Sequence, residues 1–325
     1  WGTPLPIWRT EDGQEELCIG SIAELMQEID KSIAAGFMTE NPWPKHEVGN
    51  YAQENYDPAI IDLHRPYVDN IILCSPSGKP MKRELDLIDV WFDSGAMPYA
   101  QNHYPFENQD APRTADFISE GVDQTRGWFF TLHAIHTMIE GSVAYKNVIS
   151  NGLVLDKNGN KMSKRLGNAV DPFGALDKYG ADAVRWYMLT NSSPWENLKF
   201  DPEGVDEIRR KFFGTLYNTY GFFALYANVD GWNPDPLTSN LSPLTSFTEI
   251  DKWVLSRLNS LIKEVTAAYE AYEPTKAGRA ISDFVQDDLS NWYVRLNRKR
   301  FWGGEMDADK QAAYYTLYTC LKTVA

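Results

Sequence analysis

The sequence predicts an α/β region followed by a bundle of helices. From Ile60 to Thr190 short apolar runs alternate with helical patterns, as they do where a sheet is covered by helices. Beyond about Phe200 the apolar residues recur at helical spacing throughout. With 325 residues, of which 43% are hydrophobic, the chain has enough apolar side chains for about two folded domains.

The α/β region opens with three segments of different character. Residues 1–9, "WGTPLPIWR", are typical of an aromatic strand that enters a core, and residues 21–38 have the spacing of a helix. Residues 41–58, "NPWPKHEVGNYAQENYDP", are rich in proline and asparagine, which predicts irregular structure. We therefore expect a connective insertion at about 10–60.

A strand, a glycine and a helix follow one another near the centre of the chain. "ADFIS" at 115–119 predicts the strand, and residues 121–139 begin at the turn glycine Gly121 and continue at helical spacing. Residues 146–156 predict further strand that ends in the turn "DKNGN" at 156–160. Open α/β sheets bind ligands where strands end and helices begin, so this arrangement marks a candidate binding site.

Two amphipathic helices joined by the short turn "EPTK" are expected in the bundle, which the proline-rich stretch 231–246 separates from the region before it. The apolar face of the first helix, which ends before Pro274, consists of Val254, Leu258, Leu261, Val265 and Tyr272. The apolar face of the second consists of Ile281, Val285, Leu289, Trp292 and Leu296.

Composition narrows the function classes. A formal net charge of −14 argues against non-specific binding of nucleic acid or membrane, so anion binding depends on local clusters. The cysteines Cys18, Cys74 and Cys320 lie far apart without metal-ligand spacing, which indicates a reducing compartment and neither a disulfide framework nor a metal site. No apolar run has the roughly 18 residues of a membrane span, so we expect a cytoplasmic protein without a membrane partner.

Acidic and amide side chains stand where the central strand gives way to its helix. Glu120, Asp123 and Gln124 suit hydroxyl or amino groups better than phosphates, so a ribose or an ammonium group is the expected ligand. The alternative is that they cap the helix and face solvent.

Positive charge is concentrated in "GNKMSKRLGNAV" at 159–170. Lys161 and Lys164 lie beside Ser163 between Gly159 and Gly167, so the loop can close on a polyphosphate and stabilise charge that moves onto a leaving group. The alternative is a solvated turn, which the position of the full "KMSK" string after a strand and turn disfavours.

"KMSKR" at 161–165 resembles the KMSKS signature of class I aminoacyl-tRNA synthetases, with Arg165 in place of the final serine. Further strings make the chain resemble the isoleucyl-tRNA synthetase family in particular, and they follow the family order over nearly the whole chain. These strings are "WGTPLPIW", "DLHRPYVD", "DVWFDSG", "EGVDQTRGWF", "NSSPWENLKFDPEGV" and "DLSNWYVRLNRKRFW".

The resemblance implies a fold and a reaction. It implies the C-terminal half of a class I synthetase Rossmann-like catalytic domain over residues 1–190, a stem-contact or junction region over 191–245, and the start of an α-helical anticodon-binding bundle over 246–325. The implied reaction is ATP- and Mg²⁺-dependent activation of L-isoleucine to isoleucyl-adenylate and transfer to tRNA(Ile), by a monomer.

Site residues follow from the same resemblance. Lys161, Ser163 and Lys164 would act on the ATP phosphates as the carboxylate of isoleucine attacks. The residues that would hold the adenylate are Glu120, Gly121, Asp123 and Gln124, with Asp123 on the ribose and Gln124 near the aminoacyl carbonyl. Trp91 and Trp128 would form the walls around the isoleucine side chain, which offers only its shape for recognition. The alternative for both tryptophans is ordinary core packing.

For tRNA, the resemblance implies phosphate contacts by Arg295, Arg298, Lys299 and Arg300. The neighbouring aromatic residues offer stacking surfaces or pack the bundle, and they are Trp292, Tyr293, Phe301 and Trp302.

The chain departs from the family pattern in what it lacks. Neither the HIGH motif nor an editing domain is found, the chain does not begin with Met, and it stops within a helical pattern, so we expect a fragment that is inactive by itself. Three alternatives stay open: a valyl- or leucyl-tRNA synthetase, a non-catalytic tRNA-binding protein derived from a synthetase, and an unrelated nucleotide-binding α/β protein.

Overall fold

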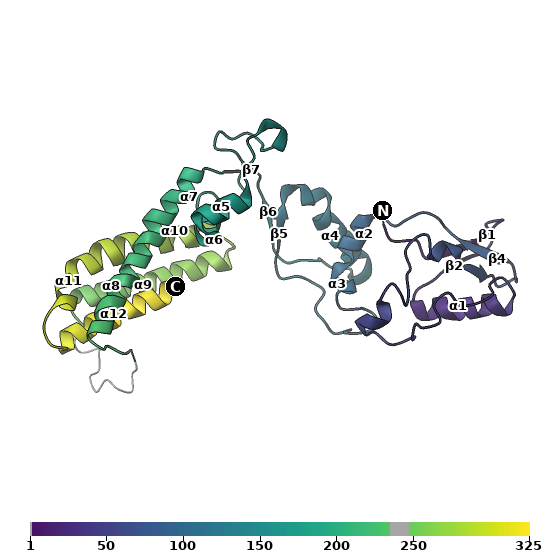
Figure 1. Ribbon diagram of the computed structural model, residues 1–325, viewed down its shortest axis with the longest axis horizontal. Helices are drawn as coiled ribbons and strands as arrows, with labels where there is room; N and C mark the ends of the chain where they lie inside the picture. The colour runs from purple at the N-terminus through teal and green to yellow at the C-terminus, as the bar shows by residue number, and fades with distance from the viewer. Residues whose placement is uncertain (1, 235–246) are drawn as a thin grey trace. The chain divides into compact units, whose positions relative to one another are not determined.

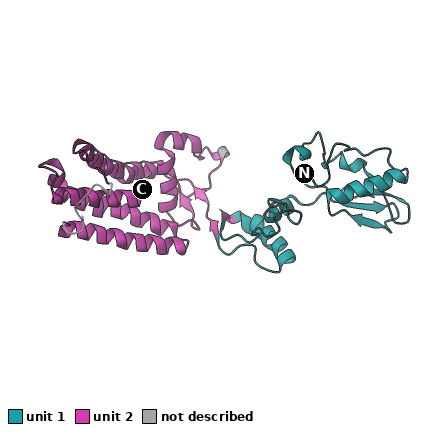
Figure 2. Ribbon diagram, turned by 90° about the horizontal axis from the view of Figure 1, so that it is seen from below, with its two compact units in different colours: residues 1–118, 123–148 teal, residues 119–122, 149–325 magenta. Residues whose placement is uncertain are grey.

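The computed structural model describes residues 2–234 and 247–325, apart from the side chain of Lys164 (Figure 1). The chain folds as two compact units. Unit 1 comprises residues 1–118 and 123–148, and unit 2 comprises residues 119–122 and 149–325 (Figure 2). Each unit has hydrophobic cores of its own.

Unit 1 begins with a four-stranded antiparallel sheet in the order β2-β1-β4-β3. The strands are β1 Ile7–Thr10, β2 Glu16–Cys18, β3 Ile72–Cys74 and β4 Pro80–Arg83. Trp8 on β1 is 1% exposed, and its indole nitrogen donates a hydrogen bond of 2.9 Å to the carbonyl of Ile71. The aromatic strand expected at residues 1–9 is therefore present only from Ile7 onwards, and Trp8 enters the core as predicted.

Helix α1, Ile22–Ala34, packs on this sheet beside β3. The Ser21 hydroxyl accepts a hydrogen bond from the amide of Glu24, which caps the first turn, and Leu25 and Ile29 are buried at the spacing of one helical turn. The helix expected at 21–38 is therefore confirmed, although it ends at Ala34. Both β2 and α1 lie within the predicted insertion at about 10–60, yet both contribute to the body of unit 1.

The proline- and asparagine-rich stretch 41–58 is irregular, as expected, and contains only the short 3₁₀ helix Gln53–Tyr56. Its loops are held by Asn55, which is 8% exposed. The Asn55 amide accepts from the Glu47 nitrogen at 3.0 Å and donates to the carbonyls of Glu47 and Asn50 at 2.9 and 2.7 Å. A buried side chain thus replaces the backbone pairing that the segment lacks.

The second part of unit 1 is helical, with α2 Val90–Gly95, α3 Met97–Ala100 and α4 Trp128–Glu140, whereas a 3₁₀ turn Val68–Asn70 lies against β4 in the first part. The predicted central strand is β5, Ile118–Gly121, which pairs with β6, Val148–Asn151, and the division between the units crosses both strands. Helix α4 starts later than expected, because Val122–Arg126 form a 3₁₀ helix first.

Unit 2 continues with a parallel pair of short strands, β7 Val154–Leu155 and β8 Leu198–Lys199. The helices in this part are α5 Pro172–Tyr179, α6 Ala181–Thr190 and α7 Pro202–Ile208, preceded by the 3₁₀ turn Lys164–Leu166. Strands and helices enclose one small core, formed by Ala175, Ala183, Val184, Tyr187, Leu198, Phe200 and Val205.

The remainder of unit 2 is a helical bundle, in which α12 packs against both α8 and α9 (Figure 1). Its members are the π-helix Arg209–Phe213, α8 Gly214–Val229, α9 Glu249–Glu270, α10 Pro274–Asp283, the π-helix Phe284–Val294, α11 Arg295–Trp302 and α12 Ala308–Val324. On α9, Val254, Leu258 and Leu261 are buried as predicted, whereas Tyr272 lies beyond the end of the helix with φ +56°. Of the predicted separating stretch, residues 235–246 lie outside the described residues.

The predicted apolar face of the next helix is only partly correct. Val285 and Leu289 are fully buried, but Trp292 and Leu296 are 56% and 58% exposed. Residues 284–294 form a π-helix, whose i→i+5 hydrogen bonds place more residues in each turn than the 3.6 of an α-helix. The buried positions therefore shift, and Tyr293, at 0% exposed, takes the place expected for Trp292.

Candidate active site

The two tryptophans expected to line a side-chain pocket lie on helices α2 and α4, which pack closely in unit 1. A Cβ atom at Gly95 would lie 2.8 Å from the backbone of Thr131, so the last turn of α2 rests directly on α4. The indole nitrogen of Trp128 donates to the carbonyl of Ser94 at 3.0 Å. This bond fixes the plane of the Trp128 ring relative to α2.

Trp91 and Gln124 meet beside Gly127, the residue that precedes Trp128. A Cβ atom at Gly127 would lie 3.0 Å from the Trp91 ring and 2.7 Å from Oε1 of Gln124, so the ring and the amide occupy the space that a larger residue would need. Trp91 stays 42% exposed. The group offers an exposed aromatic face beside an amide, which suits a ligand with an apolar part and a polar part.

Gln124 also caps α4. Its Oε1 accepts from the Trp128 amide at 3.0 Å, and its Nε2 approaches a carboxylate oxygen of Asp123 at 3.4 Å. Asp123 is exposed. The alternative interpretation of these residues as caps therefore holds for Gln124, while the Asp123 carboxylate is accessible to a ligand.

Glu120 and Gly121 form the end of β5 and belong to unit 2, unlike Asp123 and Gln124, which belong to unit 1. Glu120 is exposed. The strand is tied to its neighbour by a hydrogen bond of 3.0 Å from the Asn151 amide to the Ser119 hydroxyl.

The lysine loop lies in unit 2 and follows a tight turn. Lys161 pairs with Leu155 in an antiparallel bridge and its side chain is exposed, whereas Ser163 is half-buried. The Ser163 hydroxyl accepts from the Leu166 amide at 3.2 Å, and Gly167 has φ +65°. The loop therefore presents Lys161 to solvent from a defined backbone; the predicted role of the Lys164 side chain lies outside the described residues.

Two residues that were not predicted as functional hold this loop, Asp156 and Asn168. Asp156 accepts from the amides of Asn158 and Asn160 at 2.9 and 2.8 Å, and Asn168 donates to it at 3.0 Å. Hydrogen bonds from Asn168 and from the backbone of Asn160 lower the pKa of the Asp156 carboxyl. An aspartate at the start of "DKNGN" is a recognisable turn signal, but nothing local indicates its bond to Asn168.

On α11, the predicted phosphate contacts Arg295, Arg298 and Lys299 are exposed. Of the aromatic neighbours, Trp292 and Trp302 are 56% and 54% exposed, whereas Tyr293 and Phe301 are buried in the bundle core. Trp292 and Trp302 are thus accessible for stacking, whereas Tyr293 and Phe301 pack the bundle.

Arg300 differs from the other three basic residues because it turns into the bundle. Its guanidinium donates to the carboxylates of Asp251 and Asp309, and Asp251 is 0% exposed. A guanidinium held between two carboxylates is not available to a phosphate. We therefore leave Arg300 out of the basic surface, which consists of Arg295, Arg298 and Lys299.

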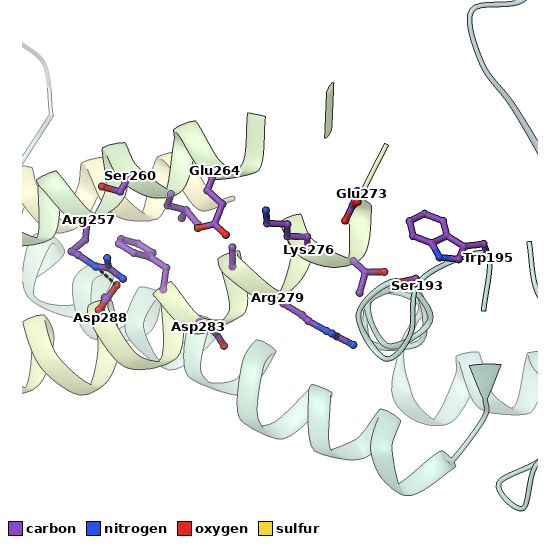
Figure 3. A pocket seen from close by; sticks show the side chains of 14 residues that line it. Ser193, Trp195, Arg257, Ser260, Glu264, Glu273, Lys276, Arg279, Asp283 and Asp288 are labelled. Atoms are coloured by element: carbon purple, nitrogen blue, oxygen red, sulfur yellow. Dashed lines mark hydrogen bonds and ion pairs between the residues drawn. The ribbon is translucent and has the colours of Figure 1, made fainter. Parts of the chain in front are cut away.

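A separate cavity of about 380 Å³ lies in unit 2 between α9, α10 and the loop at 193–195 (Figure 3). It contains none of the predicted site residues. Its charged groups are of both signs and several are already paired: Arg257 with Asp288 at 2.9 Å, and Arg279 with backbone carbonyls. This balance favours neither an anionic nor a cationic ligand.

Residues 1–201 match the family model for class I tRNA synthetases (I, L, M and V), and residues 251–325 match the model for the anticodon-binding domain of tRNA ligases. The chain belongs to the class I tRNA synthetases. The predicted combination of half a class I catalytic domain with an anticodon-binding bundle is thereby confirmed, and an unrelated nucleotide-binding protein is excluded.

Among class I synthetases, the chain is 69% identical over its whole length to the isoleucine–tRNA ligase of Bacteroides thetaiotaomicron, of which it spans 28%. The isoleucine–tRNA ligase of Thermus thermophilus is 47% identical over the whole chain, which spans 29% of that protein. The chain thus corresponds to less than a third of the length of these relatives.

The fold also resembles that of LeuRS from Agrobacterium radiobacter, solved in a ternary complex with tRNA and LeuAMS. The TM-score is 0.66 at 20% identity, over 100% of this chain and 37% of that one. At this identity the likeness establishes the class I synthetase fold and nothing finer.

Within 2–234 and 247–325, no group of three or more histidine, cysteine, aspartate or glutamate side chains could hold a metal ion. Within the same ranges, no helix is long and apolar enough to cross a membrane.

Proposed function

We propose that this chain is part of an isoleucine–tRNA ligase, which activates isoleucine with ATP and transfers it to tRNA(Ile). The 69% identity to the Bacteroides thetaiotaomicron enzyme over the whole chain carries the proposal. The chemistry within each unit supports it: unit 1 carries the exposed Asp123 carboxylate and two indoles, which suit a ribose and an aliphatic side chain, and unit 2 carries the exposed lysine loop, which suits phosphates.

In the proposed reaction the carboxylate of isoleucine attacks the α-phosphorus of ATP. The bond from that phosphorus to the bridging oxygen breaks, and pyrophosphate leaves with the electron pair. Negative charge moves onto the β-phosphate, where Lys161 and Lys164 stabilise it. The Ser163 hydroxyl accepts from the Leu166 amide and so closes the turn that contains Lys164, and we assign Ser163 the role of positioning that lysine. Mg²⁺ bound to the phosphates would share their charge.

The adenylate is proposed to bind through residues at the ends of β5 and α4. The exposed carboxylates of Glu120 and Asp123 suit hydroxyl and ammonium groups, and we assign Asp123 to the ribose. Gly121 allows the backbone to approach the ligand closely. The amide nitrogen of Gln124 makes one long hydrogen bond, of 3.4 Å, to the Asp123 carboxylate. We therefore assign to this nitrogen the contact with the aminoacyl carbonyl.

Trp91 and Trp128 are proposed to contact the isoleucine side chain. Their positions around Gly127 are fixed by the close packing of α2 on α4, which gives a rigid wall rather than an adaptable one. A rigid apolar wall recognises an aliphatic side chain by its shape.

The basic surface of Arg295, Arg298 and Lys299 is proposed to contact tRNA phosphates, since long cationic side chains exposed on one short helix can bind a polyanion despite the acidic chain. A monomeric state and a cytoplasmic location stay predictions from the sequence.

The proposal is tested by ATP–pyrophosphate exchange with the full-length protein, comparing isoleucine, valine, leucine and methionine. Exchange that is fastest with isoleucine is the expected result. Faster exchange with valine or leucine would support amino-acid activation but contradict the assignment of isoleucine as the substrate. Exchange with none of the four amino acids would favour a non-catalytic tRNA-binding protein.

A further inference from the structure

The side-chain amide of Asn168 links the lysine loop to the turn before it. Oδ1 of Asn168 accepts from the backbone nitrogen of Ser163 at 2.9 Å, while its Nδ2 donates to the backbone carbonyl of Lys161 at 3.3 Å. The same Nδ2 donates to a carboxylate oxygen of Asp156 at 3.0 Å. Asn168 therefore contacts the chain immediately before and immediately after Met162.

The orientation of this amide is dictated by its partners. The Ser163 nitrogen can only donate, and the Asp156 carboxylate and the Lys161 carbonyl can only accept. Turning the Asn168 amide over would bring its NH₂ group against an N–H and its oxygen against a carboxylate. Only one orientation satisfies all three partners, which makes Asn168 a directional link.

Asp156 connects that link to the preceding turn. One of its carboxylate oxygens accepts from the amides of Asn158 and Asn160, and its backbone nitrogen donates to the carbonyl of Asn160 at 2.9 Å. Gly159, with φ +87°, makes the tight turn possible. Lys161 is thus held on one side by the turn and on the other by Asn168.

Met162, which lies between Lys161 and Ser163, also attaches the loop to the protein through apolar packing. The Met162 side chain is half-buried and packs against the core that contains Val184 and Phe200. It lines an apolar cavity of about 340 Å³ together with them. The Met162 side chain points into the protein, while the side chain of Lys161 is exposed.

We propose that Asn168, through its link to Asp156, is a positioning residue that fixes the backbone from which Lys161 acts on ATP. The proposal rests on the proposed function of the lysine loop and goes beyond it by naming what holds the loop. A lysine carries its charge on a long flexible stem, so only a fixed backbone limits where the ammonium group can go. Misplacement of a catalytic group by about 1 Å can cost about 100-fold in rate.

Four variants of the full-length protein test the link: Asn168→Ala, Asn168→Asp, Asp156→Asn, and the combined swap of Asn168→Asp with Asp156→Asn. Asn168→Ala removes all three bonds, and Asn168→Asp sets two carboxylates against each other. The combined swap restores the hydrogen bond between the two side chains with donor and acceptor exchanged, but not the bond to the Lys161 carbonyl, so only partial recovery is expected. Asn158→Ala is the matched control, because the bond of Asn158 to Asp156 comes from its backbone nitrogen.

The first readout is ATP–pyrophosphate exchange with isoleucine. For Asn168→Ala we expect kcat to fall by about 10- to 100-fold while KM for isoleucine changes by less than about twofold. Asn168→Asp should be slower still, the combined swap should recover at least about tenfold of that loss, and Asn158→Ala should resemble the parent. Full activity of Asn168→Ala, or no recovery in the swap, would overturn the proposal.

The second readout is independent of activity. Trypsin cleaves after lysine and arginine, and Lys161 and Arg165 are both exposed in the loop. If Asn168 holds the loop, cleavage there should be faster in Asn168→Ala than in the parent or Asn158→Ala, even if the parent activates no amino acid. Equal cleavage rates would overturn the link itself, whereas faster cleavage without any exchange activity would reject only the proposed function.

Discussion

The guanidinium of Arg300 donates two hydrogen bonds, of 2.8 and 2.9 Å, to the carboxylate of Asp251, which is 0% exposed. Tyr293 donates to the same carboxylate at 2.7 Å. Burial opposes ionisation of Asp251, but the hydrogen bonds from Arg300, Tyr293 and Thr248 outweigh it and lower the pKa of the carboxyl. A fully satisfied charged group thus joins α9 to α11 inside the bundle.

Arg300→Ala is therefore expected to act on stability. It leaves a buried carboxylate without its cation, a loss that costs about 3–5 kcal/mol. Arg298→Ala, on the exposed side of the same helix, is the matched control and should stay within about 0.5 kcal/mol of the parent. The measurement is thermal unfolding of both full-length variants, and equal midpoints would contradict the structural role of Arg300.

The basic surface is expected to affect tRNA binding rather than stability. Replacing Arg295, Arg298 and Lys299 together with alanine should weaken tRNA affinity. The plot of log affinity against log salt concentration should become less steep by about 2–3, about one for each lost phosphate contact. The control is Lys263→Ala, an exposed lysine on α9. A salt dependence unchanged from the parent would place the tRNA elsewhere.

Trp128 is expected to affect the choice of amino acid. Trp128→Ala removes the wall that the bond to Ser94 holds in place, so the preference for isoleucine over valine should fall by about fourfold or more, since one methylene is worth about 0.8 kcal/mol. Trp128→Phe keeps an aromatic face and should lose less. The relative kcat/KM values in exchange measure the effect, and an unchanged ratio in Trp128→Ala would remove Trp128 from the pocket.

His136 is expected to make the stability of unit 1 depend on pH. The ring is 2% exposed and contacts the hydroxyls of Tyr99, Thr114 and Ser142, and burial lowers its pKa, with a smaller opposing effect of Glu140. Because the folded pKa lies below the unfolded value of about 6.5, the unfolded chain binds more protons between the two. Stability should be complete above the unfolded pKa and fall as the pH drops toward the folded pKa.

The check is the thermal midpoint of the parent and of His136→Gln at about pH 7.5 and about pH 5.5, on either side of the histidine value. A glutamine side chain does not titrate, so the variant should lose less stability on acidification than the parent. An equal loss in both would assign the pH dependence to other groups.

Features that depend on neighbouring residues could be predicted from the sequence, whereas contacts between residues distant in the sequence could not. The lysine loop, the α1 helix and the strand around Trp8 were predictable because charge, capping and apolar spacing are local properties. The link between Asp156 and Asn168 was not, since it joins residues across a turn whose path only the fold defines. The meeting of Trp91 with Gly127 was hidden for the same reason.

Two differences between the expected and the observed bundle have physical causes. The α-helical period of 3.6 residues does not hold through residues 284–294, where the π-helix shifts the buried face and leaves the Trp292 side chain exposed. Arg300 looked like its basic neighbours because nothing in the local sequence shows that Asp251, 49 residues earlier, is buried beside it. Charge in a sequence does not reveal whether its partner is a ligand or the protein itself.

The central claim is that the lysine loop of this chain stabilises charge on ATP as the adenylate forms. The most direct test is the single-turnover rate of adenylate formation in full-length protein with both Lys161 and Lys164 changed to alanine, beside Lys157→Ala, an exposed lysine in the preceding turn. We expect the rate to fall by about 100- to 1,000-fold in the double variant, with isoleucine binding within about twofold of the parent and Lys157→Ala unaffected. Equal rates of adenylate formation in the double variant and the parent would contradict it.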